Sequence, residues 1–305
     1  MSDFLSEFSF NSATEFLGAL SPLTSSSNLE GYIFRGHSDD AYKLIPTSVR
    51  AEKKDELWSK CALGKPIDPQ SEWETWHSEA EYYYLREFFK LADRRGLYVP
   101  HSDRVRARLV STYDTFSDLM FSAGEWLPDD LLELAGLAQH YGLPTRLLDW
   151  SHDPLVSAYF AAASAKPGTC LSVWALDADK MSYMNQTVKR SPLKLVTPPY
   201  HGNPNLAAQS GVFTCWSVRL PSTSEVANNG PLLVDRSSLE ELIETHAIRR
   251  EWKFQRSAFL KFKLPSEHAK DIMKLLERAG YGASRLFPGY DGVAKEIIRR
   301  YQSED

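Results

Sequence analysis

An arginine at the end of an apolar run is the first residue of this chain that could do chemistry. Arg35 follows Tyr32–Phe34 and precedes Gly36 and His37. A guanidinium is costly to bury unless it meets an anion or a carboxylate, and its planar fork suits bidentate binding of a phosphate. The glycine lets the backbone turn and lets a ligand approach closely. The pattern predicts either an anion-binding arginine or a structural salt bridge to an acid such as Asp149.

The second candidate is the stretch QHYGLPTRLLDWS at residues 139–151. It sets His140, Arg146 and Asp149 beside apolar residues, so these polar groups must satisfy one another or a ligand. Trp150 offers a flat face for stacking a base or a nicotinamide ring, and pockets are commonly built where strands end. The alternative is an internal Arg146–Asp149 ion pair with Trp150 in the core. His140 fits a proton shuttle or, better, a hydrogen-bond donor at a helix end.

A third polar stretch runs from Asn203 to Phe213. Gln209 could exchange hydrogen bonds with a sugar hydroxyl, and Gly211 permits close backbone approach. Capping of a strand end by Gln209 is the alternative.

Basic residues also gather in one segment and could contact nucleic acid, or could form a solvated surface. They are Arg94, Arg95, Arg104, Arg106 and Arg108, around Tyr98 and His101.

Composition and motif spacing argue against several classes of function. A net charge of -5 argues against a protein that coats nucleic acid through bulk electrostatics. The eight histidines show no metal-binding spacing, and we find no glycine-rich phosphate loop. No apolar run approaches the length of a membrane span, and the first ten residues lack a basic signal-peptide start. Three cysteines without paired spacing indicate reduced thiols. We therefore expect a cytoplasmic protein without a metal site and without a membrane partner.

The elements that must position these residues can be read from periodicity and caps. Ser12 and Glu15 predict a helix over Ala13–Leu20, and Asp153 before Pro154 predicts another through Phe160. Helical periodicity extends across residues 51–137 and includes a helix over Arg104–Phe121. Another helix is expected to begin near Asp129 and to end at Gly142. Two more are expected over Ser266–Arg278 and Asp291–Tyr301. Strands are expected at Tyr32–Phe34, ending in a tight turn at Arg35-Gly36, and at Thr145–Trp150, Thr169–Leu176, Gly211–Val218 and Phe259–Leu264, with a turn between strands at Val226–Pro231.

These elements predict an α+β domain. Residues 1–30 form an N-terminal helix and loop, and residues 31–305 form the domain. A helical insertion occupies about residues 51–137, after the first strand.

The polar stretches together resemble the FRG domain family, which is named for a Phe-Arg-Gly signature, here Phe34-Arg35-Gly36. The stretch at residues 139–151, continued by Asp153–Ala161, is similar to a second signature of that family. Asn203–Phe213 resembles a third and Leu286–Gly292 a last, so the resemblance covers about residues 30–300. The family has little settled function, so membership alone implies no activity.

A more distant similarity is to ADP-ribosyltransferases of the Arg–Ser–Glu type, which place an Arg-Gly on an early strand, a Ser-Thr-Ser on a later one and a Glu before a third. The resemblance implies a mixed or antiparallel β core with NAD as substrate, where Arg35 holds the pyrophosphate and Ser151 shapes the nicotinamide ribose site. This chain departs from the pattern with Asp149-Trp150-Ser151, and with Gln209 where the catalytic Glu would stand. An amide brings no negative charge to stabilise an oxocarbenium-like transition state, so Asp149 would have to supply it or the reaction would be slow.

The resemblance thus implies catalytic roles for Arg35, Ser151, Gln209 and Asp149, and an NAD site that adds Gly36, His37, His140, Arg146, Trp150 and Phe213. We expect an ADP-ribosyltransferase-like protein, a toxin or phage-defence effector, with a protein or nucleic acid as acceptor. A non-catalytic nucleotide-sensing or nucleic-acid-binding module is the alternative. A scaffold subunit whose aromatic residues serve an interface is the third.

Overall fold

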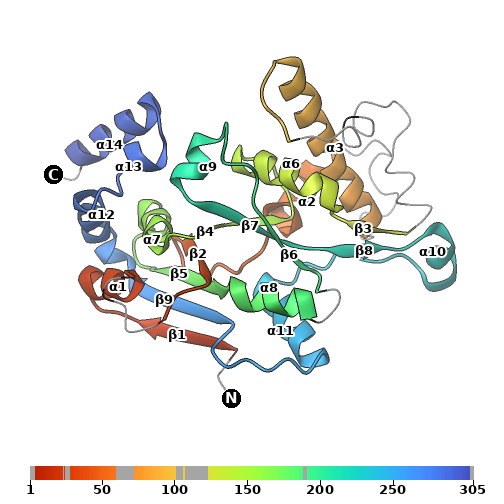
Figure 1. Ribbon diagram of the computed structural model, residues 1–305, viewed down its shortest axis with the longest axis horizontal. Coiled ribbons are helices and arrows are strands. Elements are labelled where there is room, and N and C mark those ends of the chain that lie inside the picture. The colour runs from red at the N-terminus through yellow and green to blue at the C-terminus, as the bar shows by residue number, and fades with distance from the viewer. Residues whose placement is uncertain are drawn as a thin grey trace.

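The computed structural model describes residues 4–22, 24, 28–59, 72–100, 106, 123–187 and 191–302. A seven-stranded sheet forms its centre, in the order β1-β9-β5-β2-β4-β7-β6 (Figure 1). Only β1 and β9 pair in parallel, and the other neighbours are antiparallel. This confirms the α+β class. The strands are β1 (Leu5–Ser9), β9 (Phe259–Pro265), β5 (Cys170–Asp177), β2 (Tyr32–His37), β4 (Leu147–Ser151), β7 (Gly211–Trp216) and β6 (Leu193–Val196).

Two groups of helices cover one face of this sheet. Over the half formed by β2, β5 and β9, a core packs α1 (Ala13–Leu20), α7 (Pro154–Ala163), α12 (Ala269–Arg278) and α13 (Ala283–Leu286) against residues such as Phe34, Val173 and Phe262. Over the other half, α3 (Glu74–Arg94) and α6 (Asp129–His140) pack against Leu147, Phe213 and Cys215. The boundary between the two groups therefore falls where β2 meets β4.

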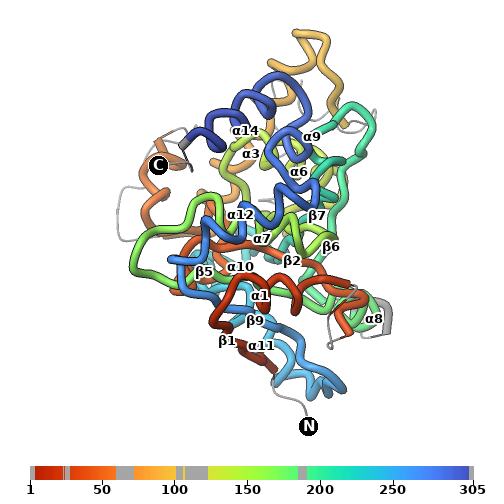
Figure 2. Tube along the Cα trace, turned by 90° about the vertical axis from the view of Figure 1, so that its left-hand side faces the viewer, coloured from red at the N-terminus to blue at the C-terminus, as the bar shows by residue number. Residues whose placement is uncertain are grey.

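The opposite face is covered by α8 (Ala178–Thr187), α11 (Leu239–Arg249) and the segment around Leu44, which bury Trp150 and Trp174. The other α-helices of the described residues are α2 (Lys54–Trp58), α9 (Pro204–Ala208), α10 (Thr223–Asn229) and α14 (Tyr290–Gln302). A two-stranded sheet of β3 (Gly124–Trp126) and β8 (Val218–Leu220) extends toward α10 (Figure 1). The N-terminal strand β1 and the C-terminal helix α14 lie far apart (Figures 1 and 2).

Local cap chemistry places the helices as expected. The Ser12 hydroxyl accepts a hydrogen bond from the backbone N–H of Glu15, and α1 begins at Ala13. Asp153 caps α7 by accepting from the N–H of Leu155, and Pro154 is the first helical residue. Gly142 follows α6 with φ of 88°, a left-handed conformation that favours glycine. The predicted α1, α6 and α7 are therefore confirmed.

Several expectations need correction. β2 does not stop before Arg35-Gly36 but continues to His37, because β5 pairs with it through His37↔Ser172. Val226–Pro231 is not a turn between strands: a capping box of Ser222 and Glu225 starts α10, and Gly230 caps it.

Other elements were not expected or lie outside the described residues. Strands β1, β3 and β6 and helix α8 are short or weakly patterned. Helix α11 was not expected either, although Ser238 and Glu241 have the S-x-x-E spacing of a capping box. The expected helix over Arg104–Phe121 lies outside the described residues apart from Arg106, which is helical.

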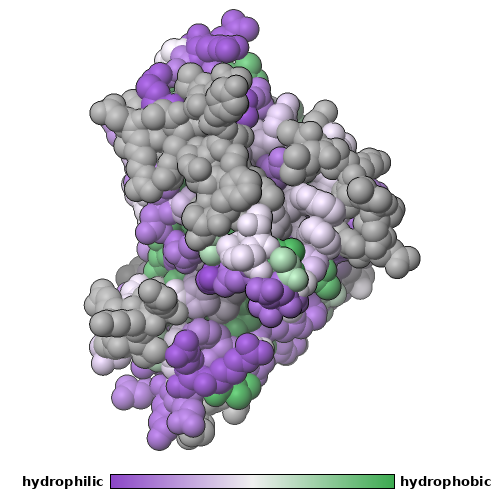
Figure 3. Space-filling view, turned by 90° about the vertical axis from the view of Figure 1, so that its right-hand side faces the viewer, coloured by the Kyte–Doolittle hydropathy of each residue, from purple (hydrophilic) through white to green (hydrophobic). Residues whose placement is uncertain are grey.

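The surface on the side of α10 is mostly hydrophilic, with small separated apolar areas among the described residues (Figure 3). No helix among those residues has the length and apolar character needed to cross a bilayer.

A buried ion network joins the helical insertion to the sheet. Arg146, just before β4, is 4% exposed and donates from Nη2 to Glu74 Oε1 and from Nε to Glu81 Oε2, both at 2.7 Å. Glu81 also accepts from the indole N–H of Trp126 at 2.6 Å. Burial alone would lower the pKa of the Arg146 guanidinium, but the two carboxylates raise it. Arg146 therefore does not pair with Asp149, because α3 supplies its acids.

We expect Arg146→Ala to lower the free energy of unfolding by about 3–5 kcal/mol, because it leaves two carboxylates buried without their partner. Arg219→Ala is the matched control, since Arg219 pairs with Glu225 but its side chain is 66% exposed, and it should change stability by about 0.5 kcal/mol or less. Urea unfolding of both variants checks this. Equal losses would show that the network does not anchor the insertion.

Candidate functional site

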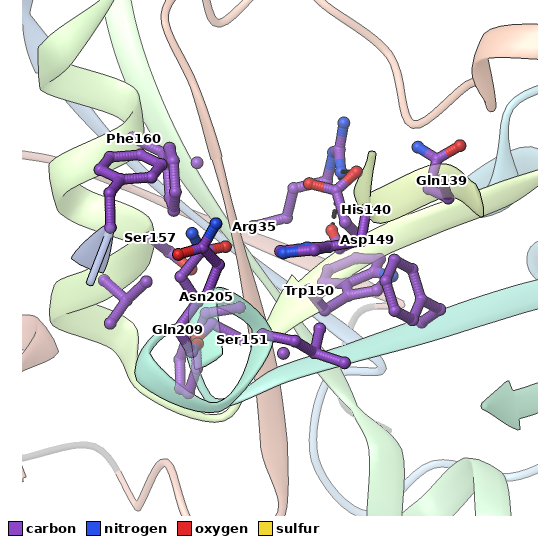
Figure 4. A pocket seen from close by; sticks show the side chains of 17 residues that line it. Arg35, Gln139, His140, Asp149, Trp150, Ser151, Ser157, Phe160, Asn205 and Gln209 are labelled. Carbon is purple, nitrogen blue, oxygen red and sulfur yellow. Dashed lines mark hydrogen bonds and ion pairs between the residues drawn. The ribbon is translucent and has the colours of Figure 1, made fainter. Parts of the chain in front are cut away.

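A cavity of about 300 Å³ opens at the boundary between the two groups of helices (Figure 4). Strands β2, β4 and β7 form its floor, and α7, α9, the end of α6 and the segment after α13 form its walls. β2 and β4 share a single registered pair, Phe34↔Ser151, so the two strands separate beside it. Polar residues that line the cavity are Arg35, Gln139, His140, Asp149, Ser151, Ser157, Asn205 and Gln209.

The wall formed by α7 depends on Gly36. A Cβ atom at this position would lie 2.0 Å from the carbonyl oxygen of Ser157 and 2.8 Å from the amide nitrogen of Ala161. Backbone atoms cannot move aside as a flexible side chain can, so only glycine allows α7 to lie directly on β2. Gly36 was expected to admit a turn and a ligand. It lines the cavity, but its lack of a side chain is required by helix packing.

Arg35 is held beside the cavity by two hydrogen bonds and an ion pair. Its Nη1 donates to the backbone carbonyl of Asp149 at 2.7 Å and forms an ion pair with Asp149 Oδ1 at 2.5 Å. Its Nε donates to His37 Nε2 at 3.1 Å. Within the described residues Nη2 has no hydrogen-bond partner, so it can meet a ligand. The salt-bridge alternative is thus realised, yet Arg35 also lines open space.

His37 orients Arg35 and does not line the cavity. It is 6% exposed, and because an arginine cannot accept a hydrogen bond, Nε2 must be the acceptor. Nδ1 then carries the proton and donates to the carbonyl of Tyr42 at 3.2 Å. Burial and the charge of Arg35 lower the pKa of His37 to about 3, so the ring stays neutral. The expected cofactor contact of His37 is replaced by a positioning role.

Asp149 provides the negative charge of the site. Desolvation would raise the pKa of its carboxyl, but the charge and hydrogen bond of Arg35 lower that pKa below its ordinary value. The side chain is 61% exposed, so the ion pair with Arg35 adds little to fold stability. It is the only acid among the described residues that line the cavity.

Ser151 and Gln209 lie together in the same cavity. The Ser151 hydroxyl donates to the backbone carbonyl of Gln209 at 2.7 Å and accepts from the N–H of Asp153 at 2.9 Å. Gln209 Nε2 donates to the carbonyl of Leu286 at 3.0 Å. Gln209 therefore does more than cap a strand end, since it is the C-cap residue of α9 and its amide ties that helix end to α13.

The other expected site residues divide into two sets. His140, Trp150 and Phe213 line the cavity, where burial lowers the pKa of His140 against the opposing effect of Asp149. The Trp150 indole N–H donates to the Thr214 hydroxyl at 2.8 Å, so its ring is fixed. Arg146 is not among the lining residues, because it is buried in the network with α3.

Among the residues that line this cavity, sequence reasoning did not assign Ser157, Phe160, Asn205 and Phe287 to the site. Ser157 and Phe160 are three residues apart on α7, a spacing that puts both on one helix face. Phe160 and Phe287 form an edge-to-face pair with centroids 6.0 Å apart. Without the contact at Gly36, nothing in the sequence indicates which face of α7 turns toward the cavity.

A larger hollow of about 1180 Å³ lies on the other side of Phe34, beside α1. Of the described residues that line it, none is Lys or Arg, while Glu30, Asp153 and Asp179 are acids. An anionic ligand would be repelled there, so we place the candidate site at Arg35.

The described residues bear only in part on metal binding and on the expected basic cluster. Among the described residues no three His, Cys, Asp or Glu side chains are placed to hold a metal ion. Arg106 forms a bidentate pair with Asp93 at 2.7 and 3.0 Å. His101, Arg104 and Arg108 lie outside the described residues, so the basic cluster stays a prediction.

Comparison with known proteins gives one match: a family model of the FRG domain matches residues 30–169. That range contains β2, α3, α6, β4 and α7, including Arg35, Gly36 and the whole 139–151 stretch. It ends before Asn203–Phe213 and Leu286–Gly292, whose place in the family signature stays a prediction. No curated protein and no solved structure matches the chain.

We expect Gly36→Ala to lower the free energy of unfolding by about 1–3 kcal/mol or more, because the added methyl group forces α7 away from β2. Gly18→Ala in α1 is the matched control: its Cβ would meet its nearest neighbour, Thr24, at 3.8 Å, and alanine favours the helix. Thermal unfolding of both variants measures the difference. A Gly36→Ala protein as stable as wild type would rule out the close packing.

Proposed function

Since this chain carries an FRG domain, we propose that the cavity at its centre binds a nucleotide of the NAD type and that the protein is an ADP-ribosyltransferase-like enzyme. The observation that carries the proposal is the convergence of Arg35, Ser151 and Gln209 on one cavity. These residues come from, or immediately precede, the neighbouring strands β2, β4 and β7, although they are far apart in the sequence.

The chemistry of the cavity suits a nucleotide. The free Nη2 of Arg35 is a donor for a phosphate oxygen, and His140 lines the same side (Figure 4). Phe160, which is 36% exposed, and Phe287 supply aromatic surface for a base or nicotinamide ring. Trp150 and Phe213 also line the cavity, but they are 4% and 1% exposed and belong to the core. Ligand pockets typically measure about 300–1,000 Å³. A cavity of about 300 Å³ can therefore enclose one half of a dinucleotide, with the other half in the open mouth.

The distant similarity supports the same assignment. Arg35 would bind the pyrophosphate, Ser151 would hold the strand end at the nicotinamide ribose, and Gln209 would take the place of the catalytic carboxylate. In a transferase of this kind the C–N bond to nicotinamide breaks, the ribose carbon develops positive charge, and an acceptor nucleophile attacks that carbon. The acceptor would be a protein or nucleic acid, as in a toxin or a phage-defence effector.

Binding without turnover is a second candidate, favoured by the charges of the site. Gln209 supplies no negative charge, and its Nε2 is engaged by Leu286. Asp149 is already paired with Arg35. No described residue that lines the cavity thus presents an uncompensated carboxylate to an oxocarbenium-like centre, so the same residues would also suit a nucleotide sensor.

Charge changes at Arg35 and Asp149 test the binding step. Arg35→Ala should weaken NAD binding at least about tenfold, the loss of one charge-assisted hydrogen bond. Asp149→Asn should strengthen binding, because it removes a carboxylate that repels phosphate while keeping an acceptor for Arg35. Arg219→Ala, a change at an exposed arginine outside the cavity, is the control. Calorimetric titration with NAD measures all four proteins, and unchanged affinity in both cavity variants contradicts the proposed site.

Gln209→Glu separates the two candidate functions. If the site catalyses transfer, the added carboxylate should raise the rate of nicotinamide release by about 10²–10³-fold. It should also cost about 1–3 kcal/mol of stability, because the Leu286 carbonyl loses its donor. Nicotinamide release from NAD is followed by chromatography, with Gln209→Ala as the variant that brings no charge. Release by neither wild type nor Gln209→Glu, in proteins that bind NAD, would favour the sensor.

A further inference from the structure

We propose that Ser157 and Asn205 form, with Gln209, an uncharged half of the cavity that recognises the hydroxyl groups of a ribose. This inference rests on the proposed nucleotide site and adds two residues that select ribose over deoxyribose. Figure 4 shows the arrangement: Ser157, Asn205 and Gln209 are grouped on one side of the cavity, and Arg35, His140 and Asp149 on the other.

Ser157 is a buried residue with a free hydroxyl. It is 2% exposed, yet it lines the cavity. Within the described chain its hydroxyl forms no hydrogen bond, and it is not among the polar atoms sealed from solvent without a partner. Its remaining exposure therefore belongs to the cavity. A buried hydroxyl without a protein partner is uncommon, because leaving such a group unpaired costs free energy.

Asn205 and Gln209 complete this side from α9. Pro204 starts the helix, and the side-chain amide of Asn203 anchors it by donating to the carbonyl of Pro199 at 2.8 Å. The Asn205 side-chain amide has no hydrogen-bond partner among the described residues. Gln209 uses Nε2 for Leu286, which leaves its Oε1 as a free acceptor.

The three free groups match the hydrogen bonding of a vicinal diol. A ribose hydroxyl is both donor and acceptor, and so is the Ser157 hydroxyl. The Asn205 amide offers donors and an acceptor, and Gln209 offers an acceptor. None of them carries a charge, so they suit a neutral sugar better than a phosphate, which Arg35 can take on the other side. The helices α7 and α9 hold these groups in place, so little ordering is needed on binding.

Gly36 explains why Ser157 is available. Because α7 lies against β2 at this glycine, its first turns overhang the strand that carries Arg35. Ser157 therefore faces the same space as Arg35, and the sugar and phosphate groups of one ligand can reach both.

The test compares NAD with the analogue that lacks the 2′-hydroxyl of the nicotinamide ribose. Wild type should bind NAD about tenfold more tightly than the deoxy analogue, the ratio expected for one hydrogen bond. In Ser157→Ala and in Asn205→Ala this ratio should fall toward one. Ser164→Ala, at the exposed end of α7, and Asn228→Ala, exposed in α10, should keep the wild-type ratio. The ratio, unlike the affinity itself, does not depend on the fraction of folded protein.

Binding of inorganic pyrophosphate distinguishes a failure of ribose recognition from a failure of the nucleotide site. It should depend on Arg35 and be unchanged in Ser157→Ala. If wild type binds NAD and the deoxy analogue equally, or if both cavity variants keep the wild-type ratio, ribose recognition by these residues is wrong while the nucleotide site stands. If neither NAD nor pyrophosphate binds, the nucleotide site and the inference from it are both wrong.

Discussion

The direct contact between the backbone of β2 at Gly36 and the first turns of α7 is the constraint on which the rest of the site depends. A Cβ at this position would lie 2.0 Å from a helix carbonyl, so the two elements touch without any side chain between them. Phe34 lies two residues before Gly36 on the same face of β2, and it is buried in the core to which α7 also contributes. Arg35, between them, reaches toward β4 instead. The Phe-Arg-Gly triplet thus combines a core residue, a polar contact across the strand gap and a packing contact in three consecutive positions.

Two arginines show how the surroundings decide what a guanidinium can do. Arg146 meets two carboxylates of α3 in an environment closed to water, so its charge is fully used in joining the insertion to the sheet. Arg35 meets one carboxylate, which is largely exposed, and a neutral histidine that fixes its orientation. Its Nη2 has no partner among the described residues, and Arg35 lines the cavity. The sequence places both arginines beside apolar strands, but only the second keeps hydrogen-bonding capacity for a ligand.

Much of the fold could be predicted because its signals are local. The caps at Ser12 and Asp153, and the glycine after α6, set helix ends through interactions within a few residues. What could not be predicted depends on contacts distant in sequence. The acids that pair with Arg146 lie about 70 residues away on α3. The sequence alone therefore favoured Asp149, an acid only three residues away, as its partner. Similarly, β2 is extended through Arg35-Gly36 by pairing with β5, which outweighs the tendency of glycine to turn.

The candidate site likewise contains residues that the sequence could identify and residues that it could not. Arg35, Asp149, Trp150, Ser151 and Gln209 could be chosen from residue type and position at strand ends, and all line the cavity. Ser157, Asn205 and Phe287 could not, because a serine in a helix, an asparagine in a short helix and a phenylalanine near the C-terminus have no distinguishing pattern. Their role depends on how α7, α9 and α13 pack around the strands.

The side-chain amide of Gln209 contributes to the shape of the cavity. Its Nε2 donates to the carbonyl of Leu286, the last residue of α13, and Phe287 follows at the cavity wall. A carboxylate could not donate this bond and would face the carbonyl oxygen, so a Glu here would weaken the docking that brings Phe287 into place. The neutral side chain therefore helps build the cavity at the position where the proposed transferase function would call for a charge. In the proposed function, any negative charge offered to the ribose must come from Asp149, and a phosphate that engages Arg35 would loosen the ion pair that now occupies it.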